Sequence, residues 1–189
     1  MIHRRPVRSM AVYSAPVSSI EHAAMAWEVQ TTLNRWIKES SKGVLIGGLA
    51  LAFYTRPRHT TDVDILFLCK EDIPSSVPGF KRNRSGAYLD KETHVEVELT
   101  TSASFDLPEH VISKVFDTAV LQGGLRVASR EGLIALKLIT ASASLRRRMG
   151  DLADVINLLE NHLSIDMLSW ELTKENLTDL DTCKAAHKP

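Results

Sequence analysis

The sequence predicts an α+β domain in which a small mixed β-sheet is flanked by helices, with further helices at its C-terminal end. Three observations support this prediction. Short apolar or alternating runs, typical of strands, occur at 44–46, 62–68 and 94–99 and are separated by segments with helical periodicity. The apolar fraction, 44% of 189 residues, is ordinary for one compact domain. After residue 128 the pattern becomes helical only.

Residues 1–20 have the composition of a basic tail. Arg4, Arg5 and Arg8 occur there, whereas the first acidic residue is Glu21. No apolar stretch of about 7–15 residues follows the arginines, as a secretory signal would require. We therefore expect a flexible N-terminal tail over 1–20.

The overall composition excludes several classes of protein. The 23 basic and 23 acidic residues give a net charge of zero, which argues against a general nucleic-acid binder. No apolar run approaches the roughly 20 residues that cross a bilayer, so no membrane partner is expected. The two cysteines, Cys69 and Cys183, lie too far apart in the sequence to match a metal-ligand spacing. We expect a cytoplasmic protein.

The first elements surround a pair of glycines. Apolar residues at helical spacing predict a helix over 21–38. A short buried strand is predicted at 44–46, running into Gly47-Gly48. The apolar stretch 49–54 then predicts a helix that ends before Pro57.

Two further strands and a loop are predicted in the middle of the chain. Residues 62–68 alternate at first and then become fully apolar, which is typical of a central strand. Residues 72–86 are rich in proline and glycine and predict a loop. The strict alternation over 94–99 predicts a half-buried strand.

The remainder is predicted to be mainly helical. The expected elements are a helix at 108–120, a strand at 125–128, a long apolar helix at 131–145 preceded by Ser129, and a helix at 150–163. We divide the chain into the tail at 1–20, a core at 21–128, a helical part of the same domain at 129–175, and a polar, frayed tail at 176–189.

Two aspartates carry the strongest chemical signal. Asp62 and Asp64 are two positions apart on a predicted strand, so their side chains project from one face, about 6–7 Å apart along the chain. Such carboxylates can hold a divalent cation, and Mg²⁺ commonly takes one or two of them. Glu96 and Glu98 share one face of the next predicted strand and can supply a third carboxylate.

Gly47-Gly48 and Lys137 add two further signals. Glycines between a strand and a helix let the backbone approach a phosphate group closely. Lys137 is the only charged residue between Gly132 and Ala143, on a helix that is apolar nearly all round. It is interpreted either as a lysine with a phosphate or carboxylate partner or as one whose head reaches water.

These residues resemble a known superfamily. The strings VLIGG at 44–48 and RHTTDVDIL at 58–66 resemble the nucleotidyltransferase superfamily, whose motif joins a Gly-Gly or Gly-Ser pair to Asp-hydrophobic-Asp. The strings LIALKL at 133–138 and RMGDLADV at 148–155 are similar to segments of its AbiEii/AbiGii-type toxin branch. The resemblance covers about residues 22–163.

The resemblance implies a nucleotidyltransferase-like fold, with the C-terminal helices closing a cleft, and a set of site residues. The implied metal ligands are Asp62, Asp64 and Glu98, with Glu96 as the alternative, and the metal is Mg²⁺ or Mn²⁺. The implied catalytic residues are Asp62, Asp64, Glu98 and Lys137. The implied nucleotide-binding residues are Gly47, Gly48, Arg58, Thr60, Lys137 and Asp151.

The implied reaction transfers a nucleoside monophosphate from an NTP to a hydroxyl of tRNA or of a protein. The branch also implies a place in a toxin–antitoxin system, with a cognate antitoxin or toxin as a partner. The third carboxylate is often an aspartate in such enzymes, whereas this chain has glutamates there. The alternative is therefore a catalytically degenerate protein of the same fold that binds a nucleotide or a partner.

Overall fold

The computed structural model describes residues 27–40, 42–56, 60–102, 107–122 and 124–187, which form a mixed α+β arrangement around a seven-stranded sheet. The strands are β1 (Val44–Ile46), β2 (Asp62–Leu66), β3 (Phe80–Arg82), β4 (Tyr88–Asp90), β5 (Glu96–Thr100), β6 (Val120–Gln122) and β7 (Leu125–Val127). The helices are α1 (Trp27–Glu39), α2 (Gly47–Leu51), α3 (Glu109–Thr118), α4 (Arg130–Ala143), α5 (Leu145–Leu159) and α6 (Lys174–Ala185).

The sheet has the strand order β3-β4-β5-β2-β1-β7-β6. Strand β2 lies at its centre, parallel to β5 and antiparallel to β1. The other parallel pair is β1 with β7, and the remaining neighbours are antiparallel. The sheet is therefore mixed, as predicted.

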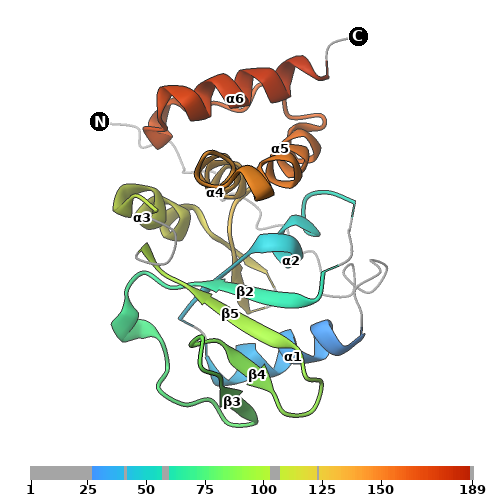
Figure 1. Ribbon diagram of the computed structural model, residues 1–189, viewed down its shortest axis with the longest axis vertical. Helices are drawn as coiled ribbons and strands as arrows, with labels where there is room; N and C mark the ends of the chain where they lie inside the picture. Colours follow the sequence, from blue (N-terminus) through green and yellow to red (C-terminus); the bar gives the residue numbers. More distant parts are fainter. Residues whose placement is uncertain (1–26, 41, 57–59, 103–106, 123, 188–189) are drawn as a thin grey trace, which may run out of the picture.

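Helices cover both faces of the sheet. Helix α1 lies on one side, and α2, α4, α5 and α6 lie on the other (Figure 1). The ring of Trp36 in α1 packs edge-on against Phe80 of β3, with centroids 5.4 Å apart, and also contacts Tyr88 of β4. Because side chains alternate along β2, the apolar side chains of Val63 and Ile65 lie on the face of the sheet that α1 covers. The polar residues of β2 consequently face the other helices.

The C-terminal helices form a packed unit beyond the sheet (Figure 1). Helix α4 is buried over most of its surface, including Leu133, Ile134 and Leu138. Helix α5 lies against α4, and α6 packs on both. Within the described ranges, no helix has the length and apolar character needed to span a bilayer.

Two helices begin earlier in the structure than the sequence predicts. The helix expected at 49–54 is α2, which already begins at Gly47, so the glycine pair lies inside the helix. The helix expected to start near Gly150 is α5, which begins at Leu145. Helix α4 ends at Ala143, and the extended backbone of Ser144 separates the two helices, while Gly150 is simply an exposed position within α5.

The predicted loop at 72–86 is partly wrong, because it contains β3. This strand pairs with β4, and Phe80 is its buried residue. Strands β3, β4 and β6 have only three residues each, so none shows an alternating run long enough to be recognised in the sequence.

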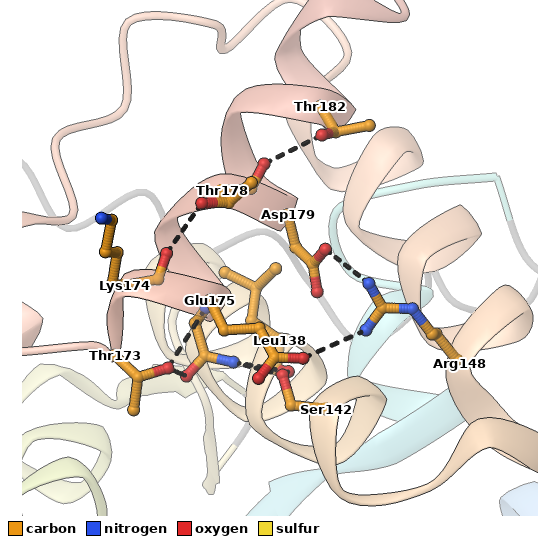
Figure 2. A network of polar contacts seen from close by, with 10 residues as sticks. Leu138, Ser142, Arg148, Thr173, Lys174, Glu175, Thr178, Asp179 and Thr182 are labelled. Atoms are coloured by element: carbon orange, nitrogen blue, oxygen red, sulfur yellow. Dashed lines mark hydrogen bonds and ion pairs between the residues drawn. The ribbon is translucent and has the colours of Figure 1, made fainter.

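The expected polar tail at 176–189 is also wrong, because most of it belongs to α6. The sequence of α6 is largely polar, but the helix buries polar groups that have partners: Asn176 Nδ2 donates to Leu138 C=O at 3.0 Å and to Ser142 Oγ at 2.7 Å. Asp179 of α6 and Arg148 of α5 point toward each other and form an ion pair of 2.6 Å (Figure 2). Tertiary contacts thus stabilise a helix that lacks a strong apolar stripe.

The packing of α6 predicts an unequal effect of two leucine truncations. Leu180 of α6 is 3% exposed and Leu168 is 78% exposed. Leu180→Ala is expected to lower the free energy of unfolding by about 2–4 kcal/mol because it leaves a cavity. Leu168→Ala should change it by about 0.5 kcal/mol or less. Urea unfolding of both variants measures this, and equal effects would show that α6 does not pack stably on α4 and α5.

Candidate functional site

Four carboxylates lie on the face of the sheet that looks toward α4 and α5. The parallel register of β2 and β5 places Asp62 opposite Glu96 and Asp64 opposite Glu98. Val63 and Val97 lie between them, fully buried, with side chains on the opposite face. The prediction that the glutamates lie beside the two aspartates is therefore confirmed.

Asp64 is the most perturbed of these carboxyls. Burial, and after it the neighbouring charges of Asp62 and Glu98, raises its pKa to about 7. Lys137 and Arg147 act in the opposite direction without cancelling the effect. The pKa of Glu98 is also raised, by desolvation and by Asp62 and Glu96. The array therefore carries excess negative charge, which favours a cation.

Gly47 brings the backbone against Asp64. Its φ of 66° lies in the left-handed region, and a Cβ at this position would stand 1.8 Å from Asp64 Oδ2. Only glycine fits both constraints. Gly48 is the next, buried residue of α2. The glycine pair and the aspartate pair, separated in sequence, are thus in contact through Gly47 and Asp64.

Lys137 has a different set of partners from the predicted triphosphate. Its Nζ lies 2.7 Å from Asp151 Oδ1 and 2.8 Å from Asp154 Oδ2. Thr140 Oγ1 donates to the other oxygen of Asp151 at 2.9 Å. Of the alternatives for this lysine, a phosphate or carboxylate partner or a head group in water, the structure shows a carboxylate partner. Asp151 lies beside it as expected. This buried cluster joins α5 to α4.

Two cavities adjoin the carboxylates. A small cavity of about 70 Å³ is lined by residues that include Asp64, Glu98, Lys137 and Arg147. A wider cleft of about 600 Å³ lies along β5 and is lined by residues that include Glu96, Glu98 and Arg82. Glu98 and Thr100 line both cavities.

Neither the models of known protein families nor the curated proteins compared with this chain give a match. The function is therefore argued from the geometry of the site.

The donor set fits a hard divalent cation. Asp62, Asp64 and Glu98 offer only oxygen ligands, and burial together with the charges of Asp62 and Glu98 raises the pKa of Asp64, so a bound cation would stabilise its ionised form. Among the described residues, no three acidic, histidine or cysteine side chains already converge as a complete ligand set. A Mg²⁺ or Mn²⁺ ion would be held by carboxylates of this set, with its other positions left to water and substrate.

The two glutamates are in different environments. Glu96 Oε1 accepts a hydrogen bond from Asn83 Nδ2 at 2.7 Å, whereas Glu98 lines the small cavity beside Asp64. This geometry favours Glu98 as the third carboxylate. Thr60 Oγ1 donates to Asp62 Oδ1 at 3.0 Å and orients that aspartate. Arg58, predicted to bind the nucleotide, lies outside the described residues.

Three residues of the site were not predicted as functional residues. Arg147 lines the small cavity with its side chain 53% exposed and lies 3.9 Å from Asp151 Oδ2. Thr140 and Asp154 complete the hydrogen bonds and ion pairs around Lys137 and Asp151. The spacing of Arg147 and Asp151, four residues apart on a helix, was the available sequence signal.

The contact between Gly47 and Asp64 predicts a site-specific effect of alanine. Gly47→Ala is expected to lower the free energy of unfolding by about 1–3 kcal/mol, because the new Cβ both overlaps Asp64 and requires a strained φ. Gly150→Ala is the matched control, since nothing lies within 4 Å of its Cβ position in α5. It should raise stability by about 0.5–1 kcal/mol. Thermal or urea unfolding distinguishes them, and equal effects would contradict the close approach.

The raised pKa of Asp64 predicts a pH-dependent gain in stability for Asp64→Asn. The folded state binds this proton more tightly than the unfolded chain does, so the contribution of Asp64 is fully present below about pH 4 and is lost as the pH rises through about 7. The free-energy difference between Asp64→Asn and the wild-type protein should shift in favour of the variant by about 2–3 kcal/mol from pH 5 to pH 8. Denaturant unfolding in EDTA measures it, and a pH-independent difference would refute the perturbed pKa.

Proposed function

We propose that the protein is a metal-dependent nucleotidyltransferase, which moves a nucleoside monophosphate from an NTP to an acceptor hydroxyl. The observation that carries this proposal is the position of Asp64, between Asp62 and Glu98 and against the backbone of Gly47. Clustered carboxylates beside a glycine pair at the start of a helix suit a metal-bound polyphosphate better than a neutral ligand. The nucleotidyltransferase-like fold and the resemblance to the AbiEii/AbiGii-type branch belong to the same proposal.

The carboxylates would hold the metal, and the surrounding residues would orient them. We assign Asp62 and Asp64 as ligands, with Glu98 as the third carboxylate. When bound, Mg²⁺ or Mn²⁺ would offset the charge on the phosphates and lower the pKa of the acceptor hydroxyl. Thr60 fixes one oxygen of Asp62 through its hydrogen bond of 3.0 Å.

Helix α5 would contribute a positive charge to the site, and α4 would hold α5 in place. Arg147 lines the small cavity together with Asp64 and Glu98, and its side chain is 53% exposed. We assign it to phosphate charge in the nucleotide. Lys137 is proposed as a positioning residue, because its ammonium is bound by Asp151 and Asp154 and thereby fixes α5, which carries Arg147, against α4.

The alternative is a catalytically degenerate protein of the same fold that binds a nucleotide or a partner. One observation favours it: the described residues contain no complete preformed metal-ligand set, and glutamate stands in place of the aspartate common in the superfamily. Retained NTP binding without transfer to any acceptor would establish this alternative.

The proposed chemistry predicts the loss of transfer in two conservative variants. Purified protein is incubated with each α-³²P-labelled NTP, Mg²⁺, and either bulk tRNA or cell extract. Asp62→Asn and Asp64→Asn should each reduce label transfer on the order of 100-fold or more, the scale expected when one transition-state electrostatic contact is lost.

The matched control for this experiment is Asp117→Asn, an exposed aspartate on α3 outside the site. It should leave transfer unchanged. Far-ultraviolet circular dichroism and thermal unfolding check that all three variants fold. Undiminished transfer in the Asp62→Asn, Asp64→Asn double variant would disprove the assignment of these residues as metal ligands.

A further inference from the structure

The cleft of about 600 Å³ beside the carboxylates contains a part of β5 that β4 does not pair with. Its lining includes residues of β5, residues 85–87 before β4, and Lys70, Ile73 and Ser75 from the segment after β2. Because Glu98 and Thr100 separate this cleft from the small cavity, a molecule lying in the cleft is adjacent to the proposed reaction site.

The edge is open because β4 turns away from β5. Tyr88 and Leu89 pair with Val97 and Glu96 in an antiparallel register, which would next place Gly86 opposite Leu99. Gly86 does not form that pair. Its φ is 95°, its N–H donates to Asn83 C=O at 3.2 Å, and its C=O accepts from Arg82 Nε at 3.2 Å. Both polar groups of Gly86 are thus used within the β3–β4 hairpin.

The polar backbone groups of Leu99 consequently face the cleft. Along a strand these groups alternate between the two neighbours, and Thr100 faces β2, since its C=O accepts from Phe67 N–H at 2.8 Å. The backbone N–H and C=O of Leu99 therefore point toward the side from which β4 has turned away. Among the described residues, no backbone hydrogen bond outside the regular strand pairings involves Leu99, and the pairing of β5 with β4 stops at Val97.

We propose that the acceptor is a protein, and that an extended segment of it pairs antiparallel with the edge of β5 at Leu99, in the orientation that β4 has further along β5, and presents a side-chain hydroxyl to the carboxylates. This inference rests on the proposed nucleotidyltransferase function. An unpaired N–H and C=O on one strand residue match the backbone of another strand. The backbone of a nucleic acid has no N–H donor for Leu99 C=O.

The register determines which side chain of the acceptor can react. The acceptor residue paired with Leu99 has its side chain on the same face as Leu99, away from the carboxylates. The next residue, opposite Thr100, projects on the face of Asp64 and Glu98, within the reach of cross-strand neighbours. A serine, threonine or tyrosine at that position would be labelled.

The transfer step balances without a further reactant. The acceptor oxygen forms a bond to the α-phosphorus of the NTP, and the bond from that phosphorus to the bridging oxygen breaks. Pyrophosphate leaves, and the hydroxyl proton passes to solvent. Lys70 and Arg82 line the cleft, so acidic residues that flank the hydroxyl should improve the acceptor.

The experiment uses the full chain, Mg²⁺, α-³²P-labelled NTPs, and ten-residue peptides with one central serine, threonine or tyrosine and acidic flanks. Labelled peptides are then resynthesised with single backbone N-methyl groups. The methyl group at the residue paired with Leu99 should reduce labelling about tenfold or more, because it removes one strand hydrogen bond. Methylation of the amides on either side should have a smaller effect, because they point away from β5.

Two matched protein variants test the location. Ser75 and Ser76 are adjacent and exposed, but only Ser75 lines the cleft. Ser75→Trp should fill the cleft and reduce peptide labelling about tenfold or more, whereas Ser76→Trp should not. Both should retain Mg²⁺-dependent NTP binding, measured by equilibrium dialysis.

The outcomes separate this inference from the proposed function. Labelling of tRNA but of no peptide, or equal effects of the three methylated positions, would overturn the strand-pairing acceptor and leave the nucleotidyltransferase intact. No transfer to any acceptor and no dependence of NTP binding on Asp62 and Asp64 would overturn both.

Discussion

The parallel pairing of β2 with β5 is the constraint on which the site depends. Backbone hydrogen bonds fix the register, and the register places Asp64 beside Glu98 whatever the charges of the two side chains. Burial and the neighbouring carboxylates then raise the pKa of both carboxyls, that of Asp64 partly through Glu98. The same strand leaves Leu99 with its polar groups directed at the cleft. One ladder thus creates both the cation-attracting face and the open edge.

The helices beyond the sheet complete the site through a second, electrostatic constraint. A lysine buried among apolar residues requires counter-charges, and Lys137 has two of them, both on α5. These ion pairs set the position of α5 relative to α4 and therefore the position of Arg147 over the small cavity. Helix α6 stabilises the unit from outside, through Asn176 and the ion pair between Arg148 and Asp179 (Figure 2).

The predictable parts of the fold were those with long or regular patterns. The alternation at 94–99 and the apolar run from 62 gave two central strands, and the strand at 44–46 was also predicted correctly. The short strands and α6 were missed for physical reasons. A strand of three residues has no measurable period, and β3 and β6 also lack the buried apolar run that made β1 recognisable. Helix α6 is stabilised by buried polar partners on other helices, which a local pattern does not contain.

For the site, the sequence by itself determined which chemical groups are available: paired aspartates on one strand face, glutamates on another, a glycine pair, and a lone lysine in an apolar helix. Tertiary structure decided their partners. It brings Gly47 into contact with Asp64 and pairs Lys137 with Asp151 and Asp154. It also directs the backbone of Gly86 into its own hairpin and away from Leu99. The physical reason is that local spacing fixes the face on which a side chain lies, whereas strand register and helix packing fix what stands opposite it.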